Sequence, residues 1–137
     1  MVCIYCPGKT QVINSRHQKR VNHIWRRRVC MACDSVFTTT EAPDLTQALV
    51  VAKAGNLEPF QRDKLFTSLH GSLRHRKSAT ADATALTATV IAALLAAAQN
   101  ATIGQNNIVR LSHATLQRFD QAAASHYAAF HPSLSKQ

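Results

Sequence analysis

The order of apolar and polar positions divides the chain into a β-rich first third and a mainly helical remainder. Residues 9–14 and 21–29 are short, β-branched and partly alternating, which is typical of strands, and 36–40 is a third β-prone run. The polar and basic residues 15–20 predict an exposed turn between the first two runs. Together the three runs predict a small three-stranded sheet.

The next part of the chain predicts a linker and a β-hairpin. Proline and turn residues in 41–44 indicate the linker. The apolar run 48–53 predicts a strand, Gly55-Asn56 predicts its turn, and Leu57-Glu58 begins the return strand.

Helices are predicted for the remainder, because apolar residues recur there every three to four positions. The predicted segments are a helix from Pro59, a helix over 81–98 capped by Ser78 or Thr80, a helical region over about 105–130, and a frayed end from Pro132 onward. The residues expected on the buried faces are Phe60, Leu65, Phe66, Leu69, Leu73, Leu86, Val90, Ile91, Leu94, Leu95, Ile108, Leu111, Leu116, Phe119, Ala123, Tyr127 and Phe130. The fold class is therefore α+β.

All four cysteines lie near the N-terminus, in two Cys-x-x-Cys pairs. The pairs are Cys3 with Cys6 and Cys30 with Cys33, and a two-residue gap lets both sulfurs of a pair face one point. The sequence shows no secretory signal that would favour disulfides, and a redox pair would leave the second pair unexplained. The spacing predicts one structural zinc ion in a zinc ribbon, with an iron–sulfur or redox role as the alternative.

The charge of the chain, +9 with a pI near 10.0, indicates a polyanionic partner. Residues 1–41 carry seven basic against two acidic side chains, a balance of +5, and 42–137 carry nine against five, a balance of +4. The charge is thus concentrated on the zinc module and not on an amphipathic helix, and Asp82 and three threonines interrupt the apolar run at 81–98. Duplex DNA is the expected partner, and no membrane association is expected.

The candidate DNA contacts are basic residues of the predicted sheet and two of its threonines. They are Arg16, Lys19, Arg20, Arg26, Arg27, Arg28, Thr38 and Thr39. Guanidinium groups suit phosphates and guanine edges, and the three consecutive arginines place charge on both faces of a strand. The alternatives are a solvated charge run and, for the threonines, β-propensity alone. We find no phosphate loop or catalytic constellation, so no enzyme is expected, and the scattered histidines lack metal-ligand spacing.

The residues resemble a known family, the bacterial NrdR repressors of ribonucleotide reductase genes, which join a zinc ribbon to an ATP-cone. The matching motifs are Cys3-x-x-Cys6, Thr10-x-Val12-Ile13-Asn14-Ser15-Arg16, Arg26-Arg27-Arg28-x-Cys30-x-x-Cys33 and Phe37-Thr38-Thr39-x-Glu41. In the second half, Val50-Val51, Gly55, Glu58-Pro59-Phe60 and Lys64-Leu65 match more weakly. The resemblance implies a DNA-binding ribbon over 1–43 and an ATP-cone-like domain over 44–137.

The resemblance also implies a cytoplasmic homo-oligomer that senses ATP or dATP through the cone. The residues that it implies for nucleotide binding are Lys53, Glu58, Lys64, Arg76 and Lys77. The family has other residues at Asn14, Trp25, Val36, Ala52, Leu57, Ala124 and His131. Three alternatives remain: a cone that only oligomerises, a ribbon that binds RNA or a transcription or translation machine, and a regulatory cone acting on an enzyme.

Overall fold

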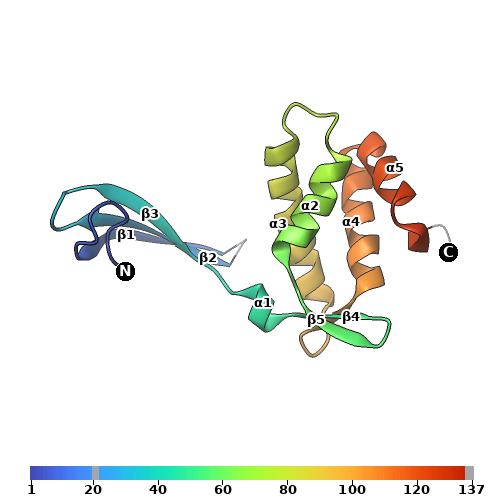
Figure 1. The fold of residues 1–137 in the computed structure, drawn as a ribbon, viewed down its shortest axis with the longest axis horizontal. Helices are drawn as coiled ribbons and strands as arrows, with labels where there is room; N and C mark the ends of the chain where they lie inside the picture. Colours follow the sequence, from blue (N-terminus) through green and yellow to red (C-terminus); the bar gives the residue numbers. More distant parts are fainter. Residues whose placement is uncertain (20–21, 135–137) are drawn as a thin grey trace. The chain divides into compact units, whose positions relative to one another are not determined.

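The computed structural model describes residues 1–19 and 22–134, and the predicted contact Arg20 lies outside them. The chain forms two compact units, Met1–Pro43 and Asp44–Gln137 (Figure 1). The first contains β-strands and the second is mainly helical with a small mixed sheet, so the predicted α+β class is confirmed.

The first unit is one antiparallel sheet of three strands in the order β1-β2-β3. The strands are β1 (Thr10–Gln18), β2 (His23–Cys30) and β3 (Val36–Glu41). The first two strands pair from Thr10 opposite Cys30 to Gln18 opposite His23, with a β-bulge between Val12 and Asn14. The expected turn at 15–20 is wrong for 15–18, because pairing with β2 carries β1 on through Gln18 although its side chains are polar. Lys19 lies in a turn, and residue 20 is outside the described residues.

The apolar core of the first unit is very small. Its buried members are Cys3, Cys30 and Phe37, with Cys6 packed beside them. Both broad faces of the sheet are therefore largely open to solvent, and a unit with so little buried apolar surface needs another source of stability.

The second unit begins with a short helix and a small sheet. The helix α1 (Leu45–Ala48) is capped by Asp44 and was not predicted. The strands β4 (Val50–Lys53) and β5 (Asn56–Pro59) form the predicted hairpin, and β6 (Thr102–Gly104), also not predicted, pairs in parallel with β4. The hairpin turn consists of Ala54 and Gly55, one residue earlier than the expected Gly55-Asn56, because Asn56 already pairs with Lys53. Both turn residues have positive φ, 45° and 86°, as a type I′ turn requires.

Within the described part of this unit, four further helices form its body (Figure 1). They are α2 (Arg62–Ser72), α3 (Ala79–Ala97), α4 (Gln105–Phe119) and α5 (Gln121–Ala129), followed by a 3-10 turn, η1 (Pro132–Leu134). The single helical region expected over 105–130 is wrong: Asp120 is extended, ends α4 and caps α5. Of the residues expected to fray from Pro132 onward, those that the structure describes form η1, whose Leu134 packs on the core, and 135–137 lie outside the described residues.

The core of the second unit combines leucines with fully or almost fully buried alanines. Leu69, Leu73, Leu94 and Leu116 have no exposed surface, and neither do Ala83, Ala123 and Ala124. Most of the expected buried positions are confirmed, but Phe119 and Phe130 are 43% and 71% exposed and Leu95 is 47% exposed. Small side chains let the helices pack closely, so this core is thin.

Helix α3 is long and apolar enough, with a mean hydropathy of 1.6, to pass a length and composition test for a membrane span. Its buried face packs against α2 and α4, and Asp82 in its first turn pairs with Arg76. Ser78 occupies the N-cap position, as expected, but its hydroxyl donates to the Asp82 carboxylate at 2.7 Å and its side chain caps no backbone N–H. The helix behaves as a packed element of a folded unit.

Candidate functional site

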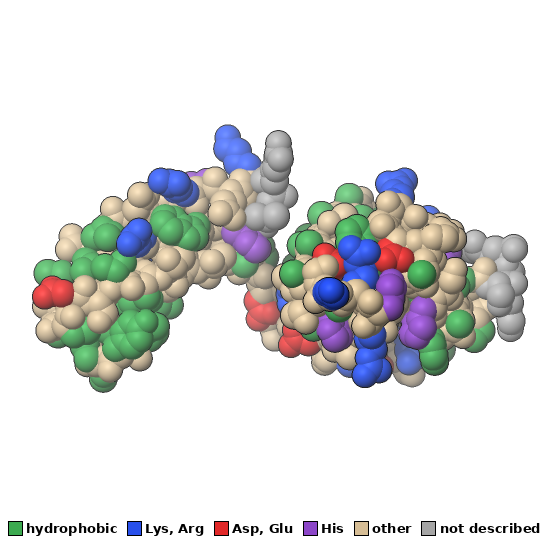
Figure 2. Space-filling view, turned by 90° about the horizontal axis from the view of Figure 1, so that it is seen from above, with side chains coloured by type: hydrophobic (Ala, Val, Ile, Leu, Met, Phe, Trp, Pro, Cys, Tyr) green, Lys and Arg blue, Asp and Glu red, His purple; other side chains and the backbone are tan. Residues whose placement is uncertain are grey.

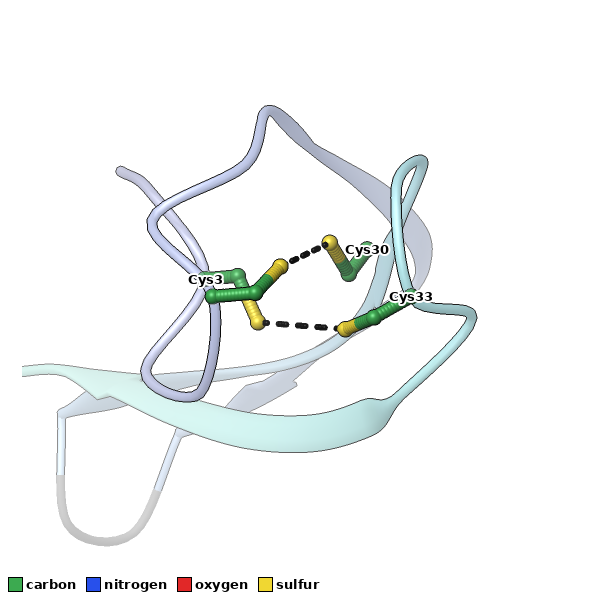
Figure 3. A group of neighbouring side chains, drawn as sticks. Cys3, Cys30 and Cys33 are labelled. Carbon is green, nitrogen blue, oxygen red and sulfur yellow. Dashed lines mark hydrogen bonds between the residues drawn. The ribbon is translucent and has the colours of Figure 1, made fainter.

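The four cysteine side chains converge on one point of the first unit (Figure 3). Their Sγ atoms all lie within 4.8 Å of one another, with Cys3 and Cys33 at 3.8 Å and Cys6 and Cys30 at 3.4 Å. Sulfurs about 2.3 Å from a tetrahedral zinc ion lie roughly 3.8 Å from one another. The cluster therefore fits one zinc ion with four thiolate ligands and leaves no position for a substrate.

Two similar loops present these sulfurs. In each loop a backbone N–H two residues after the first cysteine donates to its Sγ: Tyr5 to Cys3 and Ala32 to Cys30, both at 3.3 Å. Gly8 lies where the loops meet, and a Cβ placed on it would come within 2.8 Å of the Ala32 Cβ and 3.2 Å of the Cys30 Sγ. Only glycine leaves room for the loops to approach this closely, so Gly8 belongs to the site although its spacing did not indicate it.

The pKa values of the cysteine thiols also indicate that the cluster needs a bound cation. Hydrogen bonding from the Ser35 side chain and backbone lowers the pKa of Cys33 to about 6. For Cys6, the backbone N–H of Gly8 lowers the pKa, but the neighbouring Cys33 and Cys30 side chains raise it, and the result is about 12. A second thiolate beside the first is disfavoured without a positive charge, and a bound divalent ion would supply that charge.

The predicted DNA contacts lie along the sheet that the cluster closes. Arg26, Arg27 and Arg28 follow one another on β2, and Arg16 on β1 lies opposite Trp25. Thr38 and Thr39 face Arg27 and Arg26 from β3, and Lys19, just after β1, is exposed. The structure brings together every described candidate except Lys19 within one sheet. It also adds Glu41, whose ion pair with Arg26 the sequence did not indicate.

In the second unit, three of the predicted nucleotide-binding residues line one cavity of about 270 Å³. Lys53 ends β4, Glu58 lies on β5 and Lys64 is in the first turn of α2, with its Nζ 3.8 Å from the Glu58 carboxylate. The cavity wall is completed by apolar side chains, among them Val51, Phe60 and Ile108. Cationic groups thus stand at the edge of an apolar hollow.

Two aromatic residues of this cavity were not identified from the sequence. The rings of Tyr127 and His131 stack with their centroids 4.2 Å apart. Burial raises the pKa of Tyr127, against the lowering effect of the nearby Ser112 and Ser68 hydroxyls, and burial lowers the pKa of His131. The sequence pattern marked Tyr127 only as a core residue, because its apolar spacing does not distinguish a core position from a cavity wall.

The other two candidates, Arg76 and Lys77, do not reach this cavity. They follow the opposite end of α2 from Lys64, where Arg76 is ion-paired with Asp82 and Asp120 and Lys77 is exposed. Figure 2 views the helical unit from this end, where acidic, basic and histidine side chains lie side by side. The structure therefore separates the predicted nucleotide-binding residues into two groups.

The fold and the cysteine cluster define a zinc-ribbon protein with a helical second unit. The family described as "Transcriptional repressor NrdR-like, N-terminal domain" matches residues 1–41. The transcriptional repressor NrdR of Brucella ovis is 35% identical over 137 residues, which cover 99% of this chain and 86% of that protein. That of Symbiobacterium thermophilum is 42% identical over 69 residues, 50% of this chain and 46% of that protein. The chain belongs to the NrdR family of transcriptional repressors.

Proposed function

We propose that the chain is a cytoplasmic transcriptional repressor that binds duplex DNA through its zinc ribbon. The observation that carries the proposal is the four-sulfur cluster, which closes a sheet bearing four described arginines in an NrdR-family chain. A closed site of four cysteine ligands is structural, so its role is to hold this sheet in shape. No step of this function requires catalysis.

The proposed effector is a purine nucleotide, ATP or dATP, bound in the cavity beside β4, α2 and α5. Lys53 and Lys64 can pair with phosphate oxygens, and the apolar wall with the stacked Tyr127 and His131 suits a base. Glu58 can accept hydrogen bonds from a ribose or a base amine. Arg76 and Lys77 follow the other end of α2, where Arg76 is ion-paired with Asp82 and Asp120, and they take no part in this proposed site.

The nucleotide is proposed to act through assembly. If it stabilises one homo-oligomer over another, it changes which spacing of DNA half-sites the ribbons can match, and the two binding events are thermodynamically linked. The target implied by the family resemblance is the set of ribonucleotide reductase genes.

Native mass spectrometry of the full chain tests these points together, because it reports bound zinc, bound nucleotide and subunit count. We expect one zinc per chain and a change of subunit number when ATP or dATP is added. Replacing Lys53 by Gln should weaken nucleotide binding, whereas Arg118→Gln, an exposed residue of α4 outside the cavity, should not.

Zinc with no nucleotide and one fixed oligomer would instead support a cone that only oligomerises. Competition between duplex DNA and duplex RNA of the same sequence at equal salt tests the partner. Preference for RNA would overturn the DNA assignment.

A further inference from the structure

The strand register of the ribbon sorts its basic residues onto two different faces. Directly opposed residues of antiparallel strands point to the same side, and successive residues of one strand point to opposite sides. One side, here called the zinc face, carries the buried Cys30 and Phe37, and its other members are Thr10, Val12, Ser15, His17, Ile24, Arg26, Arg28, Thr39 and Glu41. The other side, here called the outer face, carries Gln11, Asn14, Arg16, Gln18, His23, Trp25, Arg27, Val29, Val36, Thr38 and Thr40.

The arginines of the zinc face are engaged within the sheet. Arg26 forms an ion pair with Glu41, which lies two residues from its directly opposed partner Thr39. Arg28 donates from Nε to the Thr39 hydroxyl at 3.2 Å. Both arginines are only partly exposed, and Glu41 offsets one of their two charges. A phosphate approaching this face would compete with interactions that already exist.

The outer face has the opposite properties. Arg27 is exposed and has no ion pair within residues 1–19 and 22–134, and no acidic residue lies on this face. Arg16 lies over the Trp25 ring, with its Cζ 5.8 Å from the ring centroid, which orients the guanidinium without neutralising it. Arg16 on β1 lies opposite Trp25, and Arg27 is two residues from Trp25 on β2. Residues in such a diagonal arrangement are separated by about 7–8 Å. Two unopposed cations therefore stand close together, with threonine and asparagine side chains around them.

From this arrangement we infer that the outer face, through Arg16 and Arg27 with Trp25 as their support, is the surface that contacts duplex DNA. Arg26 and Arg28 stabilise the sheet through their contacts with Glu41 and Thr39 of β3. The inference rests on the proposed function. It limits the DNA-contacting residues of the ribbon to those of the outer face. The guanidinium groups of this face would donate hydrogen bonds to phosphate oxygens or to base edges. The β-strands that carry them are a kind of element that fits into a groove of duplex DNA.

The test uses the zinc-loaded full chain and a fluorescein-labelled 30-base-pair duplex of mixed sequence, with anisotropy measured over a range of salt. Arg27→Gln and Arg16→Gln should each weaken binding about tenfold near 0.1 M salt. Log K falls as log salt rises, and each variant should reduce the magnitude of this negative slope by about 0.9 for every ribbon bound to the duplex. Arg118→Gln removes one charge from the other unit and controls for net charge. Arg26→Gln combined with Glu41→Gln removes the zinc-face ion pair at constant net charge and should leave the slope unchanged.

Charge added to the two faces provides a second comparison that does not depend on losing a contact. Thr38→Arg adds a cation to the outer face and should increase the magnitude of the negative salt slope by about 0.9. Ser15→Arg adds the same charge at an exposed position of the zinc face and should leave the slope unchanged. Bound zinc, measured by mass for every variant, verifies that the ribbon is intact.

The outcomes separate the two proposals. If the wild-type chain does not bind the duplex even at low salt, the proposed function fails and this inference fails with it. If the wild-type chain binds, but Ser15→Arg strengthens binding and Thr38→Arg does not, only the face assignment is overturned. The same holds if the Arg26 and Glu41 double variant loses as much affinity as Arg27→Gln.

Discussion

Arg76 and Asp120 form an ion pair across 44 residues of chain, with the Arg76 Nη1 atom 2.9 Å from the Asp120 Oδ2 atom. Arg76 follows α2, and Asp120 separates α4 from α5. The same carboxylate accepts from the backbone N–H of Ala123 at 3.0 Å and lies 3.0 Å from the His75 Nε2 atom. The Asp120 side chain thus caps α5 and links the α4–α5 connection to the segment that follows α2.

We expect Asp120→Ala to destabilise the helical unit more than Asp120→Asn does. Asparagine retains the N-cap for α5 but not the charge, whereas alanine loses both, so Asp120→Ala should lower the melting temperature by about 4–8 °C. Thermal unfolding followed by circular dichroism at 222 nm measures this, because every described helix lies in the second unit. Asp63→Asn, on a 96% exposed side chain in the first turn of α2, is the control. Equal losses for Asn and Ala would mean that the cap contributes nothing.

Acid should destabilise the helical unit through two carboxylates. The backbone N–H of Ala123, then His75 and Arg76, hold the pKa of Asp120 well below its usual range, and Ser78 and then Arg76 lower the pKa of Asp82. A lowered folded-state pKa contributes stability above the unfolded value, near 3.9, that is lost as the pH falls below it. The urea midpoint should therefore drop between about pH 4 and pH 2, and less steeply in the Asp82→Asn, Asp120→Asn double variant. Parallel pH profiles for the two proteins would contradict this account.

Gly8→Ala should weaken zinc binding. The added Cβ would meet the Ala32 Cβ at 2.8 Å and force apart the two loops that hold the sulfurs. We expect a loss of roughly ten- to hundredfold in zinc affinity, measured by competition with a chromophoric chelator. Gly71→Ala is the matched control, because a Cβ at that position of α2 has open space around it. Unchanged affinity in Gly8→Ala would show that the loops move apart freely.

Removal of zinc should unfold the first unit and leave the helices in place. The ribbon has only a minimal apolar core, whereas the second unit has a separate and much larger apolar core. Trp25, the single tryptophan, lies on β2 and reports the ribbon by fluorescence. With a strong chelator we expect its emission to shift to the red while ellipticity at 222 nm stays constant, and added zinc should reverse the shift. A loss of helical signal on chelation would disprove the independence of the two units.

Ala54→Asn should stabilise the second unit by roughly 1 kcal/mol, since asparagine accepts the left-handed conformation that Ala54 adopts at a φ of 45°. Gly55→Ala should destabilise by a similar amount. A Cβ at Gly55 meets no atom within 4 Å, so any loss there is conformational. Urea unfolding of both variants measures the pair, and effects of the same sign would contradict the assignment of the turn.

The parts of the structure set by short-range chemistry were predictable from the sequence. The two Cys-x-x-Cys pairs determine a metal site wherever the chain brings them together, and alternation along β2 correctly places Arg26 and Arg27 on opposite faces. The break at Asp120 was not predictable from apolar spacing, because the residues on either side of it continue a helical pattern. The partners of Arg76 were hidden for another reason, since one of them lies 44 residues away.

The alanine-lined core of the helical unit has a thermodynamic consequence. Ala79, Ala83, Ala123 and Ala124 fill buried positions with one methyl group each, so unfolding exposes less apolar surface at these positions than leucine would expose there. The heat capacity of unfolding depends chiefly on that surface and averages about 12–15 cal/mol/K per residue. The value for this unit should lie at or below the lower end of that range. Its stability should then change slowly with temperature, giving a broad, shallow curve that resists cold as well as moderate heat.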